Sequence, residues 1–212
     1  APAGEASRHL AARIATGEAL REGSLSAIEL RAAMVIGEGS ESWLMVTDLA
    51  RRLPAMLLPR WLQNTSWPIS IEDVTRGLLA ALQLPGEGSA VFELPGPERI
   101  RHRDLLQRVS RALGRRPLML DVPFVTPRLS SYWIGFVTRA DAALAKELVR
   151  GIGSDLEPRG TSLWEAAQLE PPLPLEQAFR HALADLGQND PPSSETLARL
   201  RSLGEAFGPV PT

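Results

Sequence analysis

The sequence has 212 residues, of which 44% are apolar and 23% charged, and it fits one globular domain or one domain with a small subdomain. The formal net charge of −2 gives no electrostatic reason to expect nucleic acid or an anionic membrane as a partner. Because the sequence holds no cysteine, disulfide bonds and thiolate chemistry are excluded.

The first part of the chain predicts a helix, a strand and a second helix. Apolar residues at helical spacing favour a helix over residues 5–22. Residues 26–36 are nearly all apolar and predict a buried strand. Residues 41–58 have a helical pattern until Pro54, which kinks or ends it because proline cannot donate the backbone hydrogen bond.

Further helices and strands alternate after this point. Residues 67–82 predict a short strand and then a helix that Glu72 or Asp73 can cap. The segments that follow are expected to be a strand at 90–96, a helix at 101–116 with Gly114 as its C-cap, a strand at 117–123, a mostly helical stretch at 126–152 and a last helix at 173–187.

This alternation predicts an α/β fold, with the end portion of a Rossmann-type parallel sheet and a small α/β substrate domain. The expected division is 1–85 for the nucleotide-binding part, 86–188 for the substrate domain and 189–212 for a peripheral tail. Three or four strands make a thin sheet, so we expect the N-terminal βαβ units to be absent from this chain.

Gly37 and Gly39 follow the strand at 26–36 and invite comparison with a phosphate-binding loop. The dinucleotide fingerprint needs a third glycine, which is missing here, and Glu38 and Glu41 would repel a phosphate. These glycines are therefore expected to carry the chain away from a strand end. Such an end can still line a site.

Several short motifs occur in a recognisable order. They are Leu30-Arg31 with Ile36-Gly37, the step Ile69–Val74, the strand Phe92–Pro97 and the stretch 126–138. In order and spacing they resemble the later half of an extended or atypical short-chain dehydrogenase/reductase. The stretch 126–138 is similar to the NmrA-like or nucleoside-diphosphate-sugar-epimerase-like branch, and the resemblance covers about residues 5–185.

The resemblance implies particular site residues. The family's Tyr-x-x-x-Lys helix aligns with His9 and Arg13, one helical turn apart, as the catalytic pair. His9 can act as an acid or base near neutral pH, whereas Arg13 stays protonated and can only hold a ribose. Surface positions on a helix are the alternative for both. The resemblance also implies cofactor contacts from Arg13 and from Ala32, Ala33 and Met34, and substrate contacts from Tyr132 and Trp133.

The family's pyrophosphate fingerprint precedes the Tyr-x-x-x-Lys helix by more than a hundred residues. NAD or NADP is therefore expected for the full-length protein, and no cofactor for this chain alone. The expected activity is that of an NAD(P)-dependent oxidoreductase or epimerase acting on a small molecule. A non-catalytic NmrA-like sensor or interaction protein, and an independent α/β module without a cofactor, stay open as alternatives.

The expected partners follow from the same resemblance. If the first strands are missing, residues 27–36 lie at an incomplete or intermolecular sheet edge, with Met34 and Ile36 poorly covered. A homodimer or a separate chain carrying the N-terminal half would cover that edge. The chain starts at Ala1 rather than Met, which suggests a segment cut away before it.

Membranes and metals are not expected. No apolar run reaches the roughly 20 residues that cross a bilayer, and no signal segment precedes the first helix, so we expect a cytoplasmic protein. The three histidines are scattered without carboxylates at ligand spacing. His102 is expected on a solvated face, and His181 in a structural role.

Overall fold

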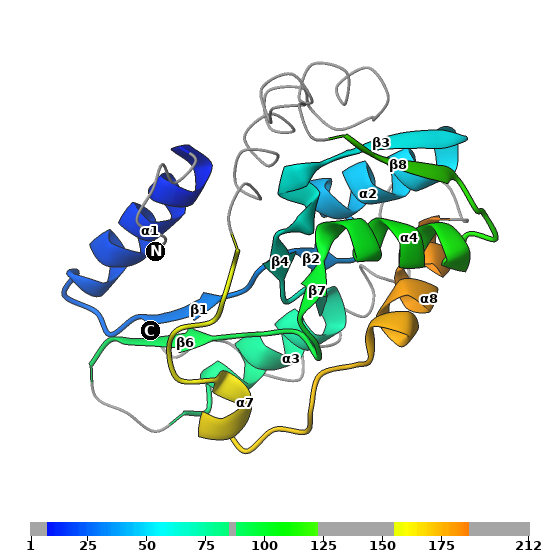
Figure 1. Cartoon of the computed structure of the whole chain (residues 1–212). Helices are drawn as coiled ribbons and strands as arrows, with labels where there is room; N and C mark the ends of the chain where they lie inside the picture. Colours follow the sequence, from blue (N-terminus) through cyan, green and yellow to red (C-terminus); the bar gives the residue numbers. More distant parts are fainter. Residues whose placement is uncertain (1–7, 85–87, 123–154, 187–212) are drawn as a thin grey trace.

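The computed structural model describes residues 8–84, 88–122 and 155–186 (Figure 1). Its helices are α1 (Arg8–Arg21), α2 (Glu41–Arg52), the 3-10 helix η1 (Arg60–Gln63), α3 (Ile71–Ala81), α4 (His102–Ala112), α7 (Leu163–Ala166) and α8 (Leu175–Leu186). Its strands are β1 (Ile28–Arg31), β2 (Val35–Ile36), β3 (Ala55–Pro59), β4 (Thr65–Ser66), β5 (Ile69–Ser70), β6 (Ala90–Glu93), β7 (Ile100–Arg101) and β8 (Leu118–Val122).

The described strands form two-stranded pairs, and parallel pairing predominates. The pairs β1–β6, β2–β5 and β3–β8 are parallel, whereas β4–β7 is antiparallel. Each parallel pair joins strands separated by a helix, as crossover connections require. The predicted α/β class with a parallel sheet is therefore confirmed. The pairs β1–β6 and β3–β8 join segments on both sides of residue 85, and the division into domains stays a prediction.

The continuous strand predicted at 26–36 is two short strands with a break between them. β1 pairs with β6, and the Leu94 N–H continues this pairing by donating to the Arg31 carbonyl at 2.7 Å. β2 pairs with β5, and the Ile69 N–H donates to the Met34 carbonyl at 3.0 Å. The chain thus changes its strand partner at residues 32–34. The apolar sequence of residues 26–36 does not show this break.

Pro54 ends α2, as predicted, but the residues after it form a strand rather than more helix. The strand β3 lies beside β8 from Ala55↔Leu118 to Pro59↔Val122, and the Leu118 N–H donates to the Pro54 carbonyl at 3.0 Å. A short apolar run is compatible with either a strand or a buried helix, so sequence periodicity could not distinguish them.

The N-cap of α3 also differs from the prediction. Ser70 is the capping residue, and its Oγ accepts the Asp73 N–H at 3.0 Å. Asp73 is the third residue of the helix rather than its cap, and its carboxylate receives the Ser70 hydroxyl at 2.7 Å. The Ser70 hydroxyl therefore caps the helix and also donates to the side chain of its third residue, Asp73.

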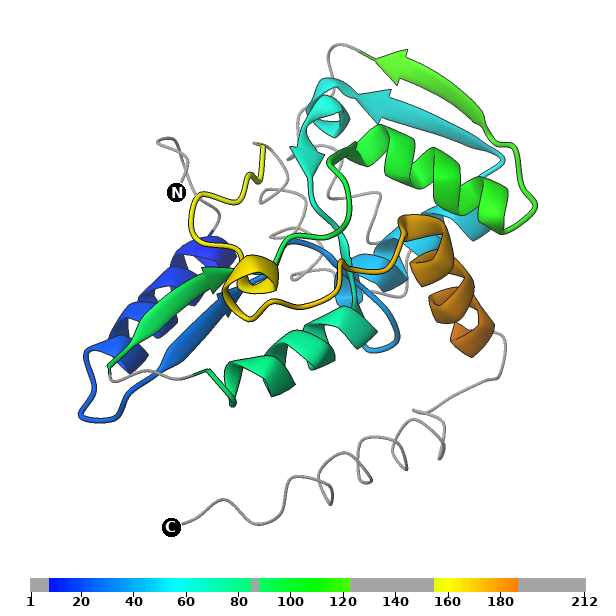
Figure 2. The same cartoon turned by 90° about the horizontal axis from the view of Figure 1, so that it is seen from below.

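Two hydrophobic clusters hold these elements together. The larger joins α2, β3, α4 and α8, where the rings of Trp43 and Phe179 stack with centroids 5.9 Å apart. The smaller lies between β5, the end of β6 and α7 and contains Ile69, Leu94 and Trp164. Figures 1 and 2 place α1 beside β1 and β6 at one end of the molecule, and α4, β3 and β8 at the other.

The predicted exposure of residues 34 and 36 is wrong for Ile36 and holds only in part for Met34. Ile36 is 1% exposed within the larger cluster, and Met34 is half-buried against it. Pairing with β5 and contacts from α2, α3 and α8 cover this strand. Among the described helices, none combines the length and apolar character needed to cross a membrane.

Candidate functional site

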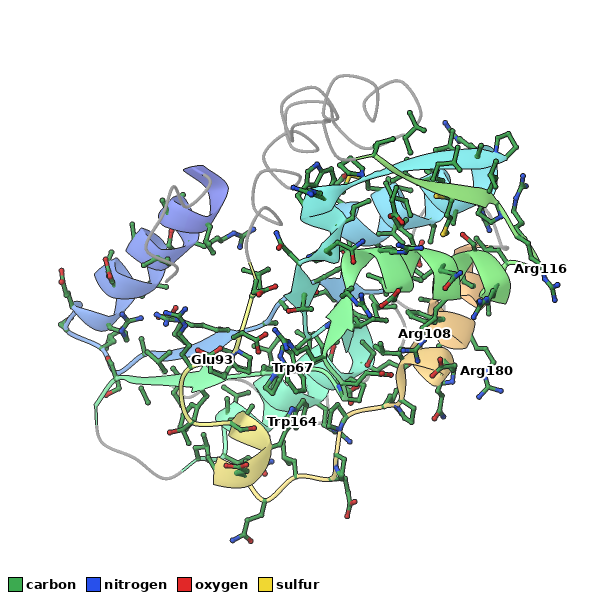
Figure 3. The ribbon with its side chains drawn as sticks, viewed as in Figure 1. Trp67, Glu93, Arg108, Arg116, Trp164 and Arg180 are labelled. Atoms are coloured by element: carbon green, nitrogen blue, oxygen red, sulfur yellow. The ribbon has the colours of Figure 1, made fainter. Side chains whose placement is uncertain are left out.

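The carboxyl ends of β1 and β6 define the candidate site. The two strands are parallel and in register from Ile28↔Ala90 to Arg31↔Glu93, so their carboxyl ends lie next to each other. Figure 3 shows Glu93 in this region, together with Trp67. Ligands of open α/β sheets bind outside the carboxyl ends of the strands. Residues 32–34, where the chain changes strand partner, directly follow the carboxyl end of β1.

Three of the four predicted cofactor residues lie at these strand ends. Ala32 is exposed, whereas Ala33 and Met34 are half-buried between β1 and β2. Arg13 is exposed on α1 and forms no ion pair with any residue that the structure describes. Their assignment to a cofactor stays a prediction.

The predicted catalytic and substrate residues are less fully described. His9 belongs to α1, and its side chain lies outside the described part of the structure. Tyr132 and Trp133 also lie outside the described residues. These roles therefore stay predictions.

A polar cluster that the sequence did not predict lies beyond the end of β6. The Gly96 N–H donates to the Trp67 carbonyl at 3.3 Å, which ties this end of β6 to the segment before β5. The cluster consists of Thr65, Trp67, Arg99, Asp155 and Glu157.

Its contacts join segments about ninety residues apart. Asp155 Oδ1 accepts both the Thr65 N–H at 2.7 Å and the Thr65 hydroxyl at 2.9 Å. Glu157 accepts the Trp67 indole N–H at 3.1 Å and pairs with Arg99 Nε at 2.6 Å. The hydrogen bonds from Thr65 hold the pKa of Asp155 below its usual range. No local motif could reveal a cluster assembled from such distant positions.

His102 is buried at the start of α4, which corrects its predicted place on a solvated face. Its side chain is 6% exposed, and burial lowers its pKa to about 4, with the Asp155 carboxylate acting in the opposite direction. At neutral pH the imidazole is therefore uncharged. The backbone N–H of His102 donates to the Asn64 carbonyl at 3.1 Å, which fixes the start of the helix.

The antiparallel pair β4–β7 also carries buried polar atoms that lack partners. Ser66 Oγ and His102 Nε2 are both buried, and neither has a hydrogen-bond partner among the described residues. Most buried polar atoms have a partner, so these two are candidates for contact with a ligand or with ordered water. Ser66 is the residue of β4 next to Thr65, and His102 follows β7 directly.

Asp73 is buried as well, but its contacts are structural. Its side chain is 2% exposed, and its carboxylate accepts the Leu173 N–H at 2.9 Å and pairs with Arg76 at 2.9 Å. Arg76 also donates to the carbonyls of Glu170 and Pro171. Because the carboxylate is fully engaged, it joins α3 to the segment before α8 and is not available for chemistry.

His181, predicted to be structural, is exposed on α8, and its Nδ1 lies 2.9 Å from the Glu72 carboxylate. Within the described ranges, no group of three or more histidines, cysteines or carboxylates is placed to hold a metal ion.

No protein-family model and no curated protein matches the sequence. Solved structures do match the fold. A UDP-galactose 4-epimerase matches with a TM-score of 0.52 and 16% identity, over 84% of this chain and 51% of its own. RMD from Pseudomonas aeruginosa, solved with NADPH, matches with a TM-score of 0.53 and 15% identity, over 82% and 52%. Triphenylmethane reductase from Citrobacter sp. matches with a TM-score of 0.60 and 15% identity, over 85% and 61%.

These comparisons establish the fold and its extent. The predicted resemblance is confirmed at the level of the fold, which the chain shares with an epimerase and a reductase. The chain spans about half the length of the first two matched structures.

Proposed function

We propose that this chain forms the substrate side of an NAD(P)-dependent oxidoreductase or epimerase of the atypical short-chain dehydrogenase/reductase type. The observation that carries the proposal is the change of strand partner at residues 32–34, at the carboxyl ends of parallel strands. It occurs in a fold shared with an epimerase, a reductase and a protein solved with NADPH.

The open edge of β1 is the proposed place for the rest of the nucleotide-binding sheet. On the far side of β6, the Glu93 N–H donates to the Thr161 carbonyl at 2.9 Å and Glu93 bridges to Ser162, so that edge is partly occupied. Along β1, the Ala27 and Arg31 carbonyls accept bonds from the β6 side. Backbone groups alternate in a strand, so those of Ile28 and Leu30 point to the opposite edge.

A further strand can hydrogen-bond to this edge. Among the described strands, β1 has β6 alone as a partner. We propose that a segment outside these 212 residues, carrying the pyrophosphate loop, adds to β1. A second copy of the chain is the alternative occupant.

The residues where the chain changes strand partner are compatible with a dinucleotide. Ala32 and Ala33 have no side chain beyond Cβ, so a ligand can approach their backbone closely. The exposed Arg13 guanidinium can donate hydrogen bonds to ribose hydroxyls. The nicotinamide would supply or accept hydride. His9 is the proposed acid or base, and Tyr132 and Trp133 are the proposed substrate contacts.

A non-catalytic, NmrA-like sensor is the second candidate, and one observation favours it. The position that resembles the family's catalytic lysine is Arg13, whose guanidinium stays protonated and cannot relay a proton. A protein of this kind would bind the cofactor without turning it over.

The test compares the full-length protein with this chain. At about 100 times its Kd, NAD or NADP should stabilise the full-length protein by about 2.7 kcal/mol and leave the 212-residue chain unchanged. Thermal unfolding measures both. Turnover of NAD(P)H with a panel of carbonyl substrates, abolished in His9→Ala, separates the enzyme from the sensor. If the short chain is stabilised equally, the phosphate-binding loop is misplaced and the proposal fails.

A further inference from the structure

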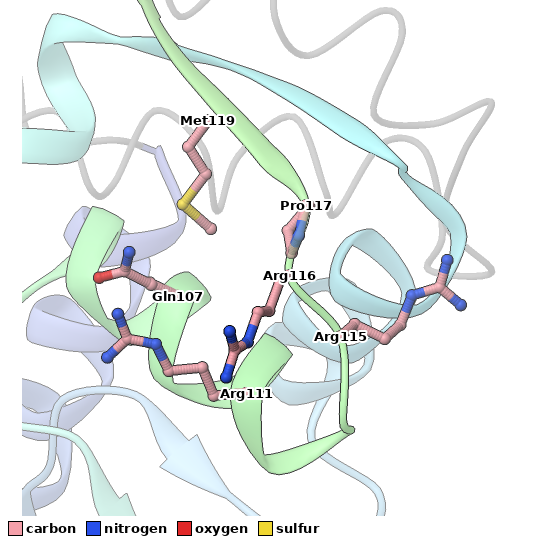
Figure 4. Close-up of a pocket in the computed structure, with 6 residues that line it drawn as sticks. All are labelled: Gln107, Arg111, Arg115, Arg116, Pro117 and Met119. Carbon is pink, nitrogen blue, oxygen red and sulfur yellow. The ribbon is translucent and has the colours of Figure 1, made fainter.

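A cavity of about 390 Å³ lies where α4 turns into β8 (Figure 4). It is lined by Gln107, Arg111, Arg115, Arg116, Pro117 and Met119. Figures 1 and 2 show this end of α4 far from β1, at the other end of the molecule. The cavity is therefore separate from the candidate site at the strand ends.

The turn that carries the arginines has a fixed backbone. The Arg115 N–H donates to the Ser110 carbonyl at 2.8 Å, and the Gly114 N–H to the Arg111 carbonyl at 2.9 Å. With Gly114 at a φ of 71°, these two bonds form a Schellman motif. Beyond the turn, the Leu118 N–H donates a hydrogen bond to the Pro54 carbonyl at the start of the β3–β8 pair. The arginines thus project from a backbone held on both sides.

The positive charge of this cavity is not balanced locally. Arg111, Arg115 and Arg116 have no acidic partner in the described part of the chain. Elsewhere on the same helix, Arg103 pairs with Asp121, and Arg108 pairs with Glu98 at 2.9 Å and with Glu176.

Neither proton loss nor the helix dipole can neutralise these arginines. A guanidinium cannot lose its charge in a protein. The carbonyl end of a helix offers only about half a negative charge, so α4 cannot neutralise three cations.

The lining combines charged, amide and apolar groups. Gln107 and Arg111 are one turn apart on α4 and share a helix face. Figure 4 shows both side chains and that of Arg116 directed toward one space, whereas Arg115 points away. Pro117 and Met119 flank the exposed Leu118 at the start of β8 and form an apolar wall.

We propose that this cavity binds a small organic phosphate monoester. The guanidinium groups of Arg111 and Arg116 hold the phosphate, because their planar donors match its oxygens in bidentate geometry. The Gln107 amide adds a donor, and the organic part rests on Pro117 and Met119. The volume lies within the range of small-molecule sites, about 300–1,000 Å³.

Phenyl phosphate is a suitable probe, since it joins a phosphate to an apolar ring. Titration calorimetry on the full-length protein should show saturable binding. Arg111→Gln and Arg116→Gln should each weaken it about tenfold, as expected for the loss of a charge-assisted bond. Arg180→Gln, at an exposed arginine of α8 with no ion pair to any described residue, is the matched control and should leave Kd within about twofold. All three positions are exposed, so the variants should keep their urea midpoints.

Two further ligands test the chemistry. Inorganic phosphate should bind more weakly than phenyl phosphate because it lacks a group for the apolar wall. Benzoate should also bind more weakly, because its single charge meets only part of the positive site. The absence of saturable binding, an equal loss in Arg180→Gln, or benzoate binding as tight as phenyl phosphate would each overturn the assignment.

Discussion

Among the described glycines, Gly96 comes closest to the backbone of another segment. A Cβ built at this residue would lie 1.7 Å from the Pro68 carbonyl oxygen and 2.5 Å from the Pro68 carbonyl carbon. Both atoms belong to the backbone, so no side chain can rotate away to make room. This approach brings the end of β6 against the segment before β5, and it positions Trp67 within the polar cluster.

Gly96→Ala should therefore lower the free energy of unfolding by about 3 kcal/mol, at the upper end for overpacking. Urea unfolding measures the change. The matched control is Gly160→Ala, where the added carbon would lie 3.4 Å from the flexible Glu93 side chain. That variant should be close to neutral. Equal midpoints for the two variants would show that the segment around Pro68 moves to accommodate the added carbon.

His102 should make stability depend on pH. Its pKa is about 4 in the folded protein, below the usual value of 6.5, because burial disfavours the charged imidazolium. Between these values the unfolded chain binds more protons than the folded one, so stability rises with pH across this window. The shift corresponds to a loss on the order of 3 kcal/mol between pH 7 and pH 4.

Replacing the imidazole should remove this contribution. Denaturant titrations of wild type and His102→Gln at several pH values give the difference. Thr75→Ala, which changes no titratable group, is the control and should keep the wild-type slope between pH 4 and pH 6.5. Because Asp155 faces His102 and also titrates, the comparison is made between variants rather than on wild type alone. Identical slopes for wild type and His102→Gln would contradict the buried neutral state.

Among the helices, α3 begins at a buried serine cap. Ser70→Ala removes the acceptor for the Asp73 N–H and the donor to its carboxylate. The expected cost is about 1–2 kcal/mol, the usual range for a lost helix cap. Thr75→Ala in the same helix is the control, since the Thr75 hydroxyl forms only an exposed bond to the Ile71 carbonyl. Thermal unfolding compares the two, and a larger loss in Thr75→Ala would contradict the importance of the cap.

In the strand β3, buried and exposed residues alternate although the sequence is apolar throughout. Met56 and Leu58 are buried and belong to the larger core cluster, whereas Leu57 between them is 52% exposed. This alternation is that of a strand, but the letters Met-Leu-Leu are apolar at every position. Pairing with β8, more than fifty residues later, decides the conformation.

At the scale of the whole molecule, the open edge of β1 should be visible in hydrogen exchange. In this chain, the amides of Ile28 and Leu30 should exchange faster than those of Glu29 and Arg31, which point to β6. Nuclear magnetic resonance resolves the four rates. Equal protection of all four amides would mean that this edge is covered, and a concentration dependence of that protection would identify a second copy as the cover.

The sequence alone determined those features that depend on local interactions. Helical spacing and Pro54 predicted α2 and its end, and Gly114 ends α4 as expected, directly after the C-cap Leu113 and with a positive φ. The alternation of helices with short apolar strands predicted the parallel α/β fold.

Tertiary structure decided which strands pair, where the long apolar run breaks, and that His102 is buried beside Asp155. It also joined Thr65 and Trp67 to Asp155 and Glu157 across about ninety residues. The physical reason is that caps and helix faces arise from neighbours in the chain. Burial, pKa and ligand geometry arise from neighbours in space, which a single sequence does not specify.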